Sequence, residues 1–149
     1  MQQVPLRTFA QTKIVENMKK RGYYEYDPVI YPRKLWVHIG YDLRDVASSE
    51  FEGVEQTEKE YYGVTYDEVV RKSDNSIGVL MSFQSAKDMR MSVCAHESSH
   101  ACDDMENAIG MEHGGEASAY LLGWIAGCVN RARLGDGDFI EVKDKDKEE

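Results

Sequence analysis

Apolar positions in the middle of the chain alternate with polar ones in the manner of β-strands. In residues 34–40, Leu35 and Val37 share one face of an extended segment, and this period of two predicts a strand. Two further strand-like runs, residues 64–71 and 77–83, are separated by the polar spacer Lys-Ser-Asp-Asn-Ser. Because these residue types favour turns, we expect the two runs to form a β-hairpin.

Helical periodicity predicts four helices, two of which are long and lie in the second half of the chain. The predicted helices cover residues 8–21, 42–51, 85–107 and 116–133. The last helix carries a broad apolar stripe that includes Leu121 and Ile125, and Gly114 and Gly115 separate it from the helix before it. The pattern as a whole predicts an α+β fold with a small, mainly antiparallel sheet and two principal helices.

The length of 149 residues suits one domain with an adequate core and hardly two. We expect this domain to cover residues 1–142 and the charged stretch 143–149 to form an acidic, disordered tail. No apolar run approaches the roughly 20 residues that span a bilayer, which argues against a membrane protein. Residues 1–7 lack the apolar stretch of a secretory signal, so a cytoplasmic location is expected.

The charge of the chain disfavours nucleic acid as a general partner. It carries 27 acidic and 18 basic side chains, a formal net charge of −9, and would be repelled by phosphate backbones. A basic segment at residues 19–21 precedes Tyr23 and Tyr24, a combination that can neutralise phosphates and stack on bases. A nucleic-acid-associated accessory protein is therefore the most remote of the alternatives.

The cysteine usage agrees with a reducing compartment. There are three cysteines, Cys94, Cys102 and Cys128, and no two of them form a C-x-x-C pair. An odd number with this spacing disfavours both a disulfide framework and a cysteine-rich zinc knuckle. We expect reduced, buried thiols.

The chemistry of the chain is concentrated in an H-E-x-x-H motif on the first of the two long helices. At 100° per residue, His96 and His100 differ by only 40° around the helix, so their rings stack one turn apart and can hold one metal ion. Glu97 lies beside that face and can take a proton from a water molecule bound to zinc. The motif therefore predicts a zinc site with a general base next to it.

The following helix is expected to supply a third ligand. Glu116 stands sixteen residues after His100, in the first turn of that helix, and an antiparallel helix pair would bring it back toward the two imidazoles. With this pattern the chain resembles the gluzincin branch of the zincin metallopeptidases, in which H-E-x-x-H is followed by E-x-x-A or E-x-x-x-D, here Glu-Ala-Ser-Ala from Glu116. The resemblance implies His96, His100 and Glu116 as zinc ligands and Glu97 as general base.

Other residues stay open as the third ligand. The alternatives are Glu106, Glu112 and His113, all of which lie between the two helices or at their ends. A metzincin pattern, H-E-x-x-H-x-x-G-x-x-H, is disfavoured because Asp103 stands in place of its glycine and Glu106 in place of its third histidine.

Four further side chains have weaker predicted roles. Tyr120, one turn beyond the predicted third ligand, can support a developing oxyanion through its hydroxyl group. Asp103 and Asp104 can orient an imidazole by accepting a hydrogen bond from it. His38 shares a face of the predicted strand with a tryptophan and is expected to be structural.

The order of the elements is also similar to the zincin layout. In that layout an edge strand beside the H-E-x-x-H helix holds an extended peptide, and here residues 77–83 run directly into the helix. The stretch at residues 30–37 is similar to short H-E-x-x-H proteins that bacterial prophages and mobile elements carry. This second resemblance extends over most of the chain and implies no activity.

These observations lead to one expected function and two alternatives. We expect a zinc-dependent metallopeptidase that hydrolyses peptide or amide bonds in a peptide or protein substrate, with Glu97 activating water. The first alternative is a catalytically silent zinc-binding protein of the phage type. The second is the nucleic-acid-associated accessory protein.

Overall fold

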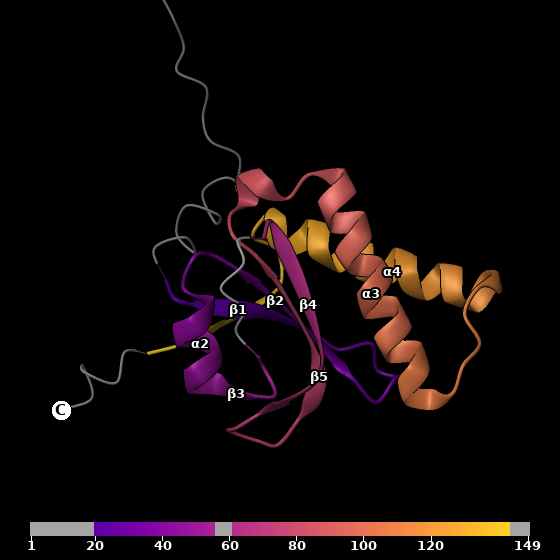
Figure 1. The fold of residues 1–149 in the computed structure, drawn as a ribbon, viewed down its shortest axis with the longest axis horizontal. Helices are drawn as coiled ribbons and strands as arrows, with labels where there is room; N and C mark the ends of the chain where they lie inside the picture. The colour runs from indigo at the N-terminus through magenta and orange to yellow at the C-terminus, as the bar shows by residue number, and fades with distance from the viewer. Residues whose placement is uncertain (1–19, 56–60, 144–149) are drawn as a thin grey trace, which may run out of the picture.

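The computed structural model describes residues 20–55 and 61–143, which form a six-stranded sheet with helices on both faces (Figure 1). The strands are β1 (Gly22–Tyr26), β2 (Lys34–Ile39), β3 (Phe51–Glu52), β4 (Gly63–Arg71), β5 (Ile77–Phe83) and β6 (Asp138–Glu141). The helices are α2 (Leu43–Glu50), the 3-10 turn η1 (Ala86–Asp88), α3 (Met91–Ile109) and α4 (Gly115–Arg133). The strand expected from residue 34, the hairpin and the two long helices are all confirmed.

The sheet has the strand order β3-β4-β5-β2-β1-β6. Every neighbouring pair is antiparallel except β2 and β5, which pair in parallel from Lys34 opposite Gly78 to Ile39 opposite Phe83. Because β2 and β5 run the same way, the chain needs a long crossover between them, and α2, β3 and β4 make up this crossover. The predicted α+β class with a mainly antiparallel sheet is confirmed.

Strand β2 is buried on both faces because helices cover both sides of the sheet. Leu35 and Val37 join the cluster that packs beneath α3 and α4, whereas Trp36 joins a second cluster beneath α2. The α3–α4 hairpin lies on one side of the sheet and α2 on the other, as Figure 1 shows. This layering presents one flank of α3 to the sheet, where β4 contacts it, and leaves another flank open to solvent.

The long helix predicted from residue 85 begins later in the structure. The hydroxyl group of Ser85 accepts a hydrogen bond from the Asp88 amide and closes the short 3-10 turn η1, after which α3 begins at Met91. Gly22 is the first residue of β1. A Cβ atom at Gly22 would lie 2.1 Å from the carbonyl oxygen of Ile140, so the glycine permits the close approach of β6.

Strand β5, expected at the edge of the sheet, lies in its interior between β4 and β2. The open edge next to α3 belongs to β4, because β3 pairs only with Val70 and Arg71 at the far end of that strand. Within the described part of the chain, no strand pairs with the outer edge of residues 63–66. The order of elements along the chain favoured β5 as the edge strand, because β5 runs directly toward the helix. In the structure, β4 pairs with β5 in antiparallel fashion and lies on its outer side.

The remaining expectations concern the ends of the chain. The predicted N-terminal helix up to residue 19 and the tail at residues 144–149 lie outside the described residues. In the basic segment before β1, Arg21 forms an ion pair with Asp42, with 3.6 Å between Nε and Oδ2. None of the described helices is both long enough and apolar enough to span a bilayer.

Candidate metal centre

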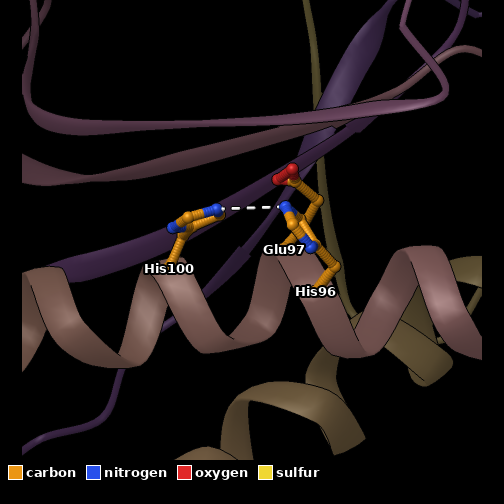
Figure 2. A group of neighbouring side chains, drawn as sticks. All are labelled: His96, Glu97 and His100. Atoms are coloured by element: carbon orange, nitrogen blue, oxygen red, sulfur yellow. Dashed lines mark hydrogen bonds between the residues drawn. The ribbon is translucent and has the colours of Figure 1, made fainter.

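The two histidines of the motif meet beside α3, and both side chains are exposed. The Nε2 atoms of His96 and His100 are 3.2 Å apart, and their ring centroids are 4.8 Å apart (Figure 2). Two nitrogen ligands at 2.0–2.1 Å from a tetrahedral zinc ion lie about 3.3 Å from each other. The observed separation therefore suits two ligands of one ion, and the i, i+4 spacing of the helix produces it.

Glu97 brings a carboxylate to the same place from the sheet-facing flank of the helix. Its side chain is directed toward the strands together with the two imidazoles (Figure 2), and only 7% of the residue is exposed. One carboxylate oxygen of Glu97 and one ring nitrogen from each of His96 and His100 all lie within 4.8 Å of one another. The structure thus assembles the three motif residues into one cluster of possible ligands.

Thr65 on β4 holds this carboxylate. Its hydroxyl group lies 3.1 Å from Oε2 of Glu97 and 3.2 Å from the backbone carbonyl oxygen of the same residue. A hydrogen bond from Thr65 limits the rotation of a side chain that would otherwise be free at the edge of the sheet. No sequence signal marked Thr65, because it lies 32 residues before Glu97 in an ordinary strand pattern.

The close approach of α3 to β4 depends on Gly63. A Cβ atom at this position would lie 3.1 Å from Cγ of Glu97 and 3.0 Å from the ring of Phe83. Contacts this short would force the helix or the phenyl ring to move. Gly63 therefore shapes the wall of the site, a role that its position before a predicted strand did not reveal.

An open pocket lies beside His96 and Glu97. It encloses about 320 Å³ and is lined by Tyr62, Gly63, Ser92, Val93, His96 and Glu97. The start of β4 forms one wall and the first turns of α3 form the other. Tyr62 lines this pocket, although the sequence pattern did not single it out.

The structure does not bring the predicted third ligand, Glu116, to the histidines. It lies exposed in the first turn of α4 and is not part of the cluster that His96, Glu97 and His100 form. The pairing of the two helices explains this, because Ser118 of α4 contacts Glu106, six residues beyond His100. Six residues amount to about 9 Å along the helix and about 120° around it.

The structure does not place Tyr120 in the pocket beside the motif either. It is 77% exposed on α4, and the pocket beside the motif is lined by other residues. Two of the alternative ligands, Glu106 and His113, join Asp103 in a separate cluster at the end of α3, and Glu112 belongs to neither cluster.

The two aspartates after the motif have different surroundings. Asp103 faces His113, with 3.4 Å between Oδ1 and Nδ1, and does not orient a motif histidine. Asp104 is half-buried, and burial raises its pKa to about 6, with a further increase from the negative charge of Asp67 on β4. The imidazole of His100 acts in the opposite direction. Acidic groups of α3 and β4 therefore gather next to His100.

His38 occupies the core, as a structural residue would. Its Nδ1 lies 2.8 Å from the Ser82 hydroxyl oxygen, and its Nε2 lies 2.8 Å from Oδ1 of Asp42. The hydrogen bond from His38 holds the pKa of Asp42 below its usual range. Ser82 is only 1% exposed, so this serine, histidine and aspartate cannot receive a substrate and do not form a hydrolytic triad.

The three cysteines are free thiols in the structure. Cys102 and Cys128 are buried and Cys94 is partly so. Burial raises the pKa of Cys128 to about 11, and burial together with the nearby Glu106 carboxylate raises that of Cys102 to about 12. Neither of the two buried thiols is therefore a ready thiolate ligand or nucleophile at neutral pH.

Comparison with known proteins found no matching family model, no similar curated protein and no similar solved structure. The likeness to gluzincins therefore rests on the motif residues themselves. Of these, His96, Glu97 and His100 come together in the fold, while Glu116 does not.

Proposed function

We propose that this protein is a zinc-dependent peptidase in which His96 and His100 hold the metal and Glu97 is the general base. The observation that carries the proposal is the 3.2 Å separation of the two Nε2 atoms, with the Glu97 carboxylate in the same cluster. Imidazole nitrogens are good zinc ligands, and the two rings are exposed, so an ion can reach them from solvent.

A zinc ion at this position would supply Lewis acidity, which lowers the pKa of water to about 7. Among the described residues, Glu97 is the only further ligand group in the cluster. The remaining coordination positions would therefore face solvent and substrate. An open coordination position is a requirement of a catalytic site, in contrast to a closed structural one.

Glu97 is suited to accept the proton. Thr65 binds Oε2, which leaves Oε1 available to take up a proton. A carboxylate held in place loses less entropy when it takes up a proton than one that must first find its orientation. As the C–N bond breaks, the same carboxyl group can donate the proton to the leaving nitrogen, which departs as an amine.

The outer edge of β4 supports a peptide as the substrate. Residues 63–66 of this strand have no pairing partner on that side among the described residues, and the first of them, Gly63, lines the pocket beside His96 and Glu97. An extended peptide can add to such an edge through main-chain hydrogen bonds, which read little sequence. A peptide paired there would pass directly beside His96 and Glu97.

We assign the support of the developing oxyanion to Tyr62 rather than to Tyr120. Tyr62 lines the pocket together with His96 and Glu97, whereas Tyr120 is exposed on α4. A phenol hydroxyl in this position can donate a hydrogen bond to the oxygen on which negative charge develops. Tyr62→Phe should lower kcat and leave zinc binding unchanged.

The decisive experiment is digestion of casein and of a peptide library by purified, zinc-loaded protein. Glu97→Gln should retain zinc and lose cleavage, and His96→Ala should lose cleavage together with the zinc equivalent that the motif holds. Glu112→Gln, a change of the same type on an exposed loop, is the matched control and should cleave like the wild type. Cleavage that survives Glu97→Gln would overturn the mechanism. Zinc binding without cleavage of any library member would favour the catalytically silent protein.

A further inference from the structure

A second group of possible ligands lies where α3 ends and the chain turns toward α4. Asp103 and Glu106 come from the last turns of α3, and His113 comes from the connecting loop. One carboxylate oxygen from each acid and one ring nitrogen of His113 all lie within 4.8 Å of one another.

Glu106 is the centre of this group. It is fully buried, with 0% of the residue exposed. Its Oε1 accepts hydrogen bonds from the Ser118 hydroxyl group and from the Cys102 thiol, the latter at 3.0 Å, whereas Oε2 faces Nδ1 of His113. Burial opposes ionisation, but the hydrogen bonds from Ser118, Cys102 and His113 together hold the pKa of Glu106 below its usual range.

This division of the two oxygens is the arrangement of a metal-binding carboxylate. Ligating carboxylates usually have their other oxygen fixed by hydrogen bonds from the protein. Here Ser118 and Cys102 fix Oε1, whereas Oε2 faces His113.

His113 faces more acceptors than it can satisfy. Its Nδ1 lies next to Oε2 of Glu106 and 3.4 Å from Oδ1 of Asp103. One ring nitrogen carries at most one hydrogen, so it can donate fully to only one of the two carboxylates. A divalent cation that displaced the hydrogen between Glu106 and His113, with the half-exposed His113 side chain shifted outward, would bind all three groups and would also neutralise the two negative charges.

The group is distinct from the cluster of His96, Glu97 and His100. The two clusters share no residue. His100 and Glu106 differ by about 120° around α3, so one cluster adjoins β4 and the other adjoins α4.

We propose that Asp103, Glu106 and His113 bind a second divalent transition-metal ion, independently of the H-E-x-x-H site. One imidazole and two carboxylates form a mixed nitrogen and oxygen set that suits Zn²⁺ or Mn²⁺ better than Mg²⁺ or Ca²⁺, which prefer oxygen alone. Asp103 and His113 are both about half exposed, which gives an ion a path from solvent. The ion would join the end of α3 to the connecting loop and, through Ser118, to α4.

The test is a zinc titration of the full chain after removal of metal by a chelator, with bound zinc measured by elemental analysis. The variant His96→Ala/His100→Ala removes the first site and should still bind one equivalent of zinc. In that background, Asp103→Asn together with His113→Gln should lose this equivalent, and Glu112→Gln should keep it. Zinc should also raise the melting temperature of His96→Ala/His100→Ala, and the added Asp103→Asn and His113→Gln should abolish that rise.

Glu106 is left unchanged in these variants because it is fully buried and its replacement would disturb the hydrogen bonds with Cys102 and Ser118, while Asp103 and His113 are exposed enough to replace. Circular dichroism of each variant in chelator verifies the fold. Less than half an equivalent of zinc in His96→Ala/His100→Ala would overturn the proposal, as would zinc that persists after Asp103→Asn and His113→Gln. Failure of the first site alone would appear differently, as wild-type binding that depends on His113 but not on His96.

Discussion

The hydroxyl group of Thr65 lies 3.1 Å from Oε2 of Glu97 and ties the central acid of the H-E-x-x-H motif to strand β4. The contact joins two residues that are 32 positions apart, and one of them, Glu97, lines the pocket beside His96. Strand β4 therefore helps to orient Glu97, the proposed general base.

Thr65→Val should therefore reduce peptide cleavage while leaving zinc bound. The substitution keeps the shape of the side chain but removes its hydrogen bond, and loss of such a supporting contact commonly reduces activity by about 10- to 100-fold. Thr65→Ser, which retains the hydroxyl group, should keep most of the activity. Steady-state kinetics should show the loss in kcat, and an unchanged kcat in Thr65→Val would show that Glu97 is oriented without this bond.

Gly63→Ala should destabilise the protein by about 1–3 kcal/mol because the added methyl group would contact Glu97 and Phe83 at 3.0–3.1 Å. Gly123 in α4 offers the matched control. A Cβ atom there meets nothing within 4 Å, so Gly123→Ala should stabilise the helix by up to about 1 kcal/mol. Urea unfolding of both variants measures the difference, and an equal change of the same sign in both would contradict the packing assigned to Gly63.

The contribution of Asp104 to the stability of the metal-free protein should fall as the pH rises from about 4 to about 6. Asp104 has its pKa raised from 3.8 to about 6 in the folded state, chiefly by burial, so the folded protein binds more protons than the unfolded chain in this range. Stability attributed to this group is present at low pH and is lost as the pH passes the folded pKa.

Asp104→Asn removes this dependence. Allowing for the partial exposure of the group, the variant should be more stable than the wild type by about 1–2 kcal/mol above pH 6 and equally stable near pH 3. Urea unfolding in chelator at several pH values checks this, with Glu112→Gln expected to retain the pH dependence of the wild type. A constant difference between Asp104→Asn and wild type at all pH values would contradict the assigned pKa.

Arg71→Leu should cost about 3 kcal/mol or more. Arg71 is buried, forms ion pairs at 2.7 Å with Glu25 and Asp74, and has its guanidinium carbon 5.4 Å from the Trp36 ring centroid. Removing it would leave Glu25 without its buried partner.

The comparison variant is Arg131→Leu. The ion pair of Arg131 with Asp136, at 2.9 Å, lies between two half-exposed side chains, so its loss should cost about 1 kcal/mol or less. Thermal and urea unfolding of the two variants compare a buried with an exposed arginine. A similar loss of stability in both variants would show that the burial of Arg71 does not increase its contribution to the free energy of unfolding.

Much of the local structure was predictable because it depends on neighbours in the chain. Alternation identified β2, β4 and β5, and the period of 3.6 identified the two long helices. Strand β6 was missed, since its four residues Asp138–Glu141 have no strong pattern and become a strand by pairing with β1. Their partner lies more than 110 residues away, a distance over which periodicity carries no information.

The candidate site also has a local part that could be predicted from the sequence and a long-range part that could not. The meeting of His96 and His100 follows from helix geometry alone and was predicted correctly. The prediction that Glu116 would return to them required the turn between α3 and α4, which is closed by Gly110 in the left-handed conformation and by a hydrogen bond from the Met111 amide to the Glu106 carbonyl. That turn places Glu116 near the end of α3 instead.

By itself, then, the sequence determined the elements and the spacing of the histidines, because both are set by interactions within a few residues. Only the tertiary structure decided that β5 lies inside the sheet and β4 beside the motif, that Thr65 holds Glu97, and that Glu106 and His113 form a cluster of their own. These relationships depend on which surfaces pack together. Packing is chosen by the burial of the whole apolar surface, to which every element contributes at once.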